Sequence, residues 1–118
     1  MKIKTGELTG SALDWAVLKC VKFPMIGAQG FVLRDPDGDD DDMRLCQPSI
    51  NWLDGGPIIE REKITVGVAD GDDVGWTAWA RCSDQKYWAC GPTPLIAAMR
   101  CYVASKLGDE VGVPKKLT

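Results

Sequence analysis

The sequence contains no histidine. Zinc sites that need imidazole ligands, Ser-His-Asp triads and Cys-His dyads are therefore excluded. The five cysteines, an odd number, include no C-x-x-C pair, which argues against a closed disulfide framework or a zinc ribbon. A catalytic thiolate would need a base and an electropositive pocket, and neither is evident near any cysteine. We expect reduced cysteines that pack as small hydrophobic side chains, no catalytic residue, and hence a protein that is not an enzyme.

Long apolar runs are also lacking. No run approaches the roughly 18 to 20 residues that span a bilayer, and residues 1–7 lack the apolar stretch of a secretion signal. Basic residues are in the minority, because 14 Lys and Arg stand against 17 Asp and Glu, which gives a formal net charge of -3. We therefore expect a cytoplasmic protein whose partners include neither duplex nucleic acid nor a membrane.

The composition predicts one soluble globular domain over residues 1–118, since 45% of the 118 residues are hydrophobic and 26% are charged. Residues 35–42 form an acidic insertion between two short predicted strands, 31–34 and 43–46. Asp35, Asp37 and Asp39 have the spacing of a calcium loop, but the glycine comes at the fourth position and Cys46 stands where a bidentate Glu is needed. We predict no metal site and no cofactor.

Helical spacing of apolar residues predicts two longer helices. One covers residues 8–20 and begins between Thr5 and Thr9, either of which can cap it. The other begins after Thr93, a good N-cap, and ends at Gly108, and its apolar stripe is expected to pack on a sheet. Residues 109–118 read as an extended or frayed tail.

A short helix and three strands are predicted between these two helices. The short helix follows a loop that starts at residue 47, with Pro57 in its first turn and two glycines, 55 and 56, that permit close backbone approach. Alternation of apolar and polar residues predicts strands over 64–68, 74–82 and 85–90, joined by turns at 70–73 and 83–84. The elements together predict the α+β class, with a three-stranded antiparallel meander.

Three segments, 8–17, 51–62 and 91–109, resemble the NinX-like proteins of tailed bacteriophages. The resemblance covers nearly the whole chain, departs from the family at the acidic insertion, and extends more distantly to a phage group with an alpha-beta-alpha sandwich. It implies a phage protein with a small sandwich of this kind, in which the meander lies between the N-terminal and C-terminal helices. Because the family is named for a genome location, the resemblance implies no catalytic residue.

Two features suggest binding. The first-turn N-H groups of the last helix favour anions, although Thr93 as a simple cap explains the same residues. Tryptophan is frequent, with five in the chain, and Trp and Arg side chains can stack a base and hold phosphates, fill a core, or anchor a protein interface. The candidate ligand-binding residues are Trp52, Arg61, Trp79, Arg81, Thr93 and Arg100.

We therefore expect a non-enzymatic phage accessory protein that acts by binding in the host cytoplasm. The most specific hypothesis is sequestration of a host nucleotide that serves as an immune signal. The alternative is a protein-interaction module that inhibits or redirects a host protein, with the acidic segment 37–42 imitating the charge of a nucleic acid or steering a basic partner. A homo-oligomer is expected in either case, because two small helices on a short meander bury a limited core.

Overall fold

The computed structural model describes residues 2–21, 25–26, 31–33, 43–45, 47–69, 75–82 and 84–113. The helices in these ranges are α1 (Gly10–Val21), α2 (Trp52–Glu62), α3 (Pro94–Leu107) and a short 3-10 helix, η1 (Thr5–Glu7). The strands are β1 (Lys2–Lys4), β2 (Met25–Ile26), β3 (Phe31–Leu33), β4 (Met43–Leu45), β5 (Thr65–Val68), β6 (Trp76–Cys82), β7 (Gln85–Gly91) and β8 (Glu110–Gly112). They pair antiparallel as β1-β8, β2-β3-β4 and β5-β6-β7. The α+β class and the three-stranded meander are confirmed.

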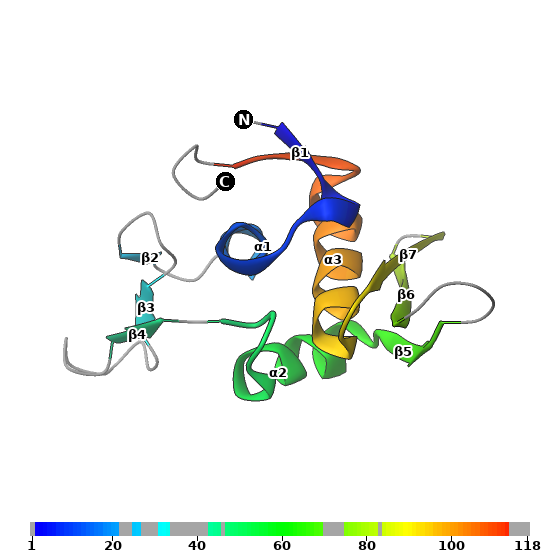
Figure 1. The fold of residues 1–118 in the computed structure, drawn as a ribbon, viewed down its shortest axis with the longest axis horizontal. Coiled ribbons are helices and arrows are strands. Elements are labelled where there is room, and N and C mark those ends of the chain that lie inside the picture. Colours follow the sequence, from blue (N-terminus) through cyan, green and yellow to red (C-terminus); the bar gives the residue numbers. More distant parts are fainter. Residues whose placement is uncertain are drawn as a thin grey trace.

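Helix α3 is the middle layer of the fold. It packs on β6 and β7 with one side and against α1 with another, and α2 contacts it as well (Figure 1). We expected the sheet to lie between the N-terminal and C-terminal helices. In the structure the C-terminal helix, α3, lies between the sheet and α1. The reason is that α3 is apolar almost all round, and a helix of this kind is buried on every side. Its buried residues are Leu95, Ala97, Ala98, Met99, Cys101, Tyr102 and Val103.

The predicted ends of α3 are confirmed. The Thr93 side chain accepts a hydrogen bond from the N-H of Ile96 at 3.1 Å, and Pro94 is the first helical residue. Gly108 follows the last turn with φ at 88°, a conformation that costs glycine little because it has no Cβ. The start of the helix is therefore fixed by a side-chain cap and its end by a glycine.

The meander has the predicted strand faces. Ala78 and Ala80 are buried on the side of β6 that α3 covers, whereas Trp79 and Arg81 point to the other side. The segments 31–33 and 43–45 pair as predicted, and the two-residue strand β2, which the sequence did not predict, extends that second sheet. The acidic residues 35–42 and the predicted turn at 70–73 lie outside the described residues.

The N-terminal segment is tied to the far end of α3. The Thr5 hydroxyl donates to the carbonyl of Gly108 at 2.5 Å, and the Thr5 N-H donates to the carbonyl of Asp109 at 2.7 Å. Thr5 is therefore not the cap of the first helix, and α1 begins instead directly after Thr9. Residues 110–112 of the predicted tail are extended, since β8 pairs with β1, and Val111 is buried.

Helix α2 begins earlier than predicted. Its N-cap is Asn51, whose side chain accepts from the N-H of Leu53 at 3.0 Å, so Pro57 lies inside the helix and not in its first turn. The prediction of the start was wrong because a local cap at Asn51 outweighs the cost of an interior proline. The early start also places Gly55 inside α2, at the point where this helix contacts α3.

Gly55 permits the close approach that was predicted, and the elements that α2 approaches there are α3 and the preceding turn. A Cβ atom on Gly55 would lie 2.5 Å from the carbonyl oxygen of Pro48 and 2.7 Å from Cδ2 of Leu95. On the other side of this turn, Asp14 of α1 is 6% exposed and accepts the N-H of Ser49 at 2.8 Å. Burial raises the pKa of the Asp14 carboxyl, and the hydrogen bond from the Ser49 N-H opposes that shift.

We predict that Gly55→Ala lowers the free energy of unfolding by about 1 to 2 kcal/mol, because the clash with a backbone carbonyl exceeds the gain in helix propensity. Denaturant unfolding followed by circular dichroism measures the change. The control is Gly67→Ala in β5, where an added Cβ meets no atom within 4 Å and no loss is expected. Equal stability of the two variants would contradict the close contact of α2.

Candidate functional site

Burial protects two of the described cysteines. Cys20, Cys82, Cys90 and Cys101 are free thiols in the structure. Burial raises the pKa of the Cys20 and Cys101 thiols to about 11, so both stay protonated at neutral pH. Within the ranges that the structure describes, no group of three or more Cys, Asp or Glu side chains could hold a metal ion, and no helix is long and apolar enough to cross a membrane.

Arg100 is a fixed cation on the middle turns of α3. Its Nε donates to the carbonyl of Leu8 at 2.7 Å, and its Nη1 donates to the carbonyl of Cys90 at 2.9 Å. Burial lowers the pKa of Arg100, but a guanidinium keeps its proton at neutral pH. No described carboxylate forms an ion pair with it. A half-buried charge that is held rigidly and lacks a counter-ion can bind an anion.

A hollow of about 610 Å³ opens beside Arg100. Trp76 lines it from the start of β6, and Trp88 lines it from β7, where that side chain is 67% exposed. The complete lining is Gly6, Ala69, Trp76, Trp88, Ala89, Cys90, Gly91, Pro92 and Arg100. Two indole rings with one guanidinium suit a ligand that is both planar and negatively charged.

Two glycines allow close packing of the strand ends beside this hollow, and one of them, Gly91, lines it. Gly75 has φ at 128°, and a Cβ there would lie 2.6 Å from the carbonyl oxygen of Gly91. A Cβ on Gly91 would lie 2.8 Å from the backbone nitrogen of Ala97 in α3. The two strand ends can therefore pack against each other and on α3 only because both residues lack a side chain, and this packing places Trp76 close to Arg100.

Thr93 and Trp52 lie together at a second hollow of about 210 Å³, at the start of α3. Thr93 already accepts the N-H of Ile96 with its hydroxyl and the N-H of Ala97 with its carbonyl, at 3.0 Å. Two of the first-turn N-H groups that could have bound an anion, those of Ile96 and Ala97, are therefore already bonded within the start of the helix. The structure supports the cap at Thr93 more strongly than a ligand there.

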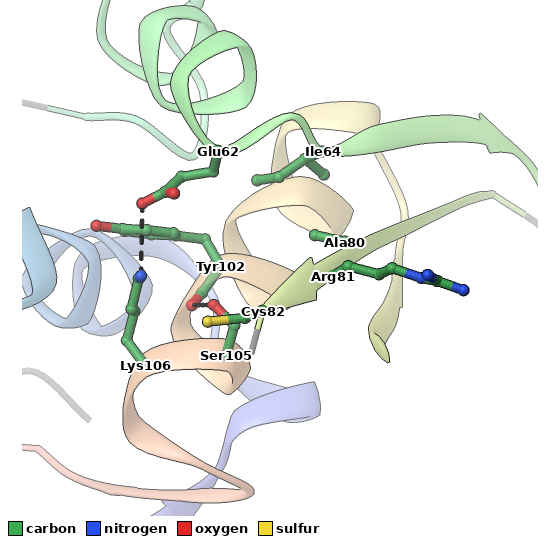
Figure 2. A pocket seen from close by; sticks show the side chains of 8 residues that line it. All are labelled: Glu62, Ile64, Ala80, Arg81, Cys82, Tyr102, Ser105 and Lys106. Atoms are coloured by element: carbon green, nitrogen blue, oxygen red, sulfur yellow. Dashed lines mark hydrogen bonds and ion pairs between the residues drawn. The ribbon is translucent and has the colours of Figure 1, made fainter. Parts of the chain in front are cut away.

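Arg61 belongs to a polar cluster that joins α2 to α3. Figure 2 shows its other members, Glu62, Tyr102 and Lys106. The Nη2 of Arg61 lies 3.4 Å from the Tyr102 hydroxyl, to which it donates, and 3.8 Å from the carboxylate of Glu62. Glu62 also pairs with Lys106 at 3.7 Å, and Lys106 lies over the Tyr102 ring at 5.9 Å from its centre. Glu62, Tyr102 and Lys106 also line a small hollow of about 30 Å³. This volume is enough for one water molecule and too little for a larger ligand.

Arg81 and Trp79 lie on the uncovered face of the meander. Figure 2 shows Arg81 extending from β6 away from the other side chains of the cluster. Trp79 lies beside Trp88 across the strand pair, and Lys86 sits over its ring with Nζ 4.4 Å from the ring centre. Of the six candidate residues, Arg61 lines none of the hollows described, Trp52 and Thr93 share one, Trp79 and Arg81 line one each, and only Arg100 lines the hollow of about 610 Å³. Trp76 and Trp88, which accompany it there, were noted in the sequence as aromatic residues near the sheet but were not included among the candidates.

Residues 4–106 match the model of the family described as Bacteriophage P22, NinX. The matched range includes all of the meander and the complete lining of the hollow beside Arg100. No curated protein matches the chain. The family description states no activity, so the chemistry of the site has to be argued from its geometry.

We predict that Arg100→Met lowers the free energy of unfolding by about 2 kcal/mol, because the carbonyls of Leu8 and Cys90 each lose a charged donor. Chemical denaturation measures the loss. Arg81→Met is the matched control, since Arg81 is exposed, and a change within about 0.5 kcal/mol is expected. A loss no larger than that of the control would show that the two carbonyls do not depend on Arg100.

Proposed function

The chain belongs to the bacteriophage P22 NinX family, and from this premise we propose that it acts by binding an anionic, planar small molecule, a nucleotide, at the hollow beside Arg100. In this proposal the protein holds the ligand without converting it. Its place of action is the cytoplasm of the host cell, where it sequesters a nucleotide that the host uses as an immune signal.

The observation that carries the proposal is the combination of Arg100 with Trp76 and Trp88. Arg100 has two of its nitrogens fixed by backbone carbonyls, and its charge has no counter-ion among the described residues. A phosphate would supply that counter-ion through a charge-assisted hydrogen bond, typically worth about 1.5 to 3 kcal/mol. A base stacked on one of the indole rings would add about 1 to 3 kcal/mol.

The groups around the hollow support binding without turnover. Arg100 does not exchange a proton near neutral pH, and the indole nitrogens of Trp76 and Trp88 donate hydrogen bonds but do not act as bases. The sequence supplies no histidine that could take the role of a base. General acid-base chemistry needs a group whose pKa lies near the working pH. Apart from Arg100 and the thiol of Cys90, the lining has no ionisable side chain.

A second candidate function is protein binding through the start of α2. Ile50, Trp52 and Leu53 are 64%, 56% and 59% exposed and follow one another within four positions. Exposed apolar and aromatic residues that cluster in this way are typical anchors of a protein interface. The acidic segment 37–42 would then steer a basic host protein toward the molecule.

We predict that a panel of linear and cyclic nucleotides contains a member that stabilises the protein in a thermal-shift assay. A ligand at 100 times its dissociation constant adds about 2.7 kcal/mol to the free energy of unfolding. Trp88→Ala and Arg100→Lys should remove most of the shift relative to each variant's own unfolding temperature. Trp52→Ala should keep it, because Trp52 lines a different hollow. If a nucleotide stabilises all four proteins equally, it binds elsewhere and the proposed site is wrong.

For the second candidate we predict capture of a host protein from lysate that depends on exposed side chains. Replacing the six acidic residues Asp35, Asp37, Asp39, Asp40, Asp41 and Asp42 with Asn should weaken capture at low salt, and Trp52→Ala should weaken it at any salt concentration. Quantitative mass spectrometry of the bound fraction measures both effects. Capture of the same proteins in the same amounts by all three versions would refute this candidate.

A further inference from the structure

The outer face of the meander is the face that α3 does not cover. Its residues are Thr65 and Gly67 of β5, Thr77, Trp79 and Arg81 of β6, and Lys86, Trp88 and Cys90 of β7. None of these residues is acidic, although the chain has a formal net charge of -3. The outer face therefore concentrates aromatic and basic side chains, and it includes two candidate residues, Trp79 and Arg81, that do not line the hollow beside Arg100.

Two cations stand directly opposite each other on the outer face. Arg81 of β6 pairs in register with Lys86 of β7, and both side chains are exposed. Like charges at directly opposite positions destabilise a sheet. Within the described residues, no carboxylate forms an ion pair with either cation. An anion bound here would offset the repulsion, so the pair favours an anionic partner over an apolar one.

Two indole rings lie next to this pair of cations and are open to solvent. Trp79 is directly opposite Trp88, and their exposed fractions are 38% and 67%. Together with Thr77 and Lys86 they line a hollow of about 370 Å³. The Lys86 ammonium lies over the Trp79 ring, 4.4 Å from its centre. At an exposed site that contact is weaker than base stacking, so a base can displace the ammonium, which is then free to bind a phosphate.

Trp88 connects the outer face with the hollow beside Arg100, because it lines both hollows. Arg100 is held at the carbonyl of Cys90, which lies four residues along β7 from Lys86. A strand rises about 3.3 Å per residue, so the two cationic positions are about 13 Å apart, with the indole pair between them. A ligand that contacts both positions needs phosphates spaced along a chain, with flat groups between them.

We propose that the outer face extends the site beside Arg100 and that the ligand is a short single-stranded oligonucleotide, an inference that rests on the proposed function. One phosphate binds Arg100, and successive bases stack on Trp88 and Trp79. A later phosphate accepts hydrogen bonds from Arg81 and Lys86. Because every base has a flat aromatic face, stacking of this kind carries little preference for sequence.

The same observations disfavour two other occupants of the outer face. A second copy of the chain would bring the same two cations, Arg81 and Lys86, and no carboxylate from its own outer face, so the charges would not be complementary. A duplex has its bases stacked within the helix, so it could meet the cations but would leave Trp79 and Trp88 without a base. The exposed indoles therefore favour unpaired bases.

The test measures dissociation constants by calorimetry for thymidine nucleotides that are one, two, four and eight units long. Affinity should rise at least about tenfold from one unit to four and then level off. Trp79→Ala should weaken binding of the four-unit ligand at least about fivefold and change that of thymidine monophosphate less than twofold. Arg81→Gln should reduce the salt dependence of the longer ligand by about 0.7 in the slope of log K against log salt.

The control variant is Lys19→Gln, which removes an exposed charge from α1, on the other side of α3, and should change neither affinity nor slope. Equal affinity for one and four units, or an unaltered affinity in Trp79→Ala, would overturn the extension while the proposed function stands. Equal binding of a hairpin duplex would show that charge alone acts and would overturn it too. Binding of the four-unit ligand that depends on Trp79 and not on Arg100 would support the outer face and contradict the proposed function. No binding at any length would overturn this inference, and the nucleotide panel then decides the proposed function separately.

Discussion

The burial of α3 on nearly every side is the constraint on which the rest of the structure depends. A helix with buried residues on all of its turns needs cover from several directions, and the meander, α1 and α2 supply it. Arg100 is the basic residue in the middle of this helix, and it can stay there because two carbonyls accept its hydrogen bonds. The same packing that buries α3 therefore also fixes the cation on which the proposed site is built.

The sequence predicted features that depend on neighbouring residues. Thr93 with Pro94 marked the start of α3, and alternation along residues 76–82 marked a strand with Trp79 facing outward. Features that depend on distant residues could not be predicted. The bond from Thr5 to the carbonyl of Gly108 spans 103 positions, and the contact of Gly55 with Leu95 joins two helices that are separated in the sequence by the whole meander. The local signal at Thr5 was therefore assigned to a helix start that a tertiary contact overrides, whereas the signal at Pro57 was overridden by the local cap at Asn51.

The sequence predicted which types of residue form the candidate site. It did not predict which of those residues lie together in the fold. Arg100 was among the candidates, and Arg61 and Arg81 were expected beside it. Instead, both lie near Tyr102, at the end of β6 that is farther from Trp76. What brings Trp76 and Trp88 to Arg100 is the close packing of two glycine-bearing strand ends, which no local pattern reveals.

The most direct test of the central claim uses the tryptophans themselves as reporters. The chain has five indole N-H groups, which give separate signals in a proton-nitrogen correlation spectrum of labelled protein titrated with a nucleotide extract of host cells. Our account predicts that the signals of Trp76 and Trp88 shift together with the Nε-H of Arg100, while those of Trp15 and Trp52 stay in place. Shifts confined to Trp52, or a spectrum that the extract leaves unchanged, would contradict it.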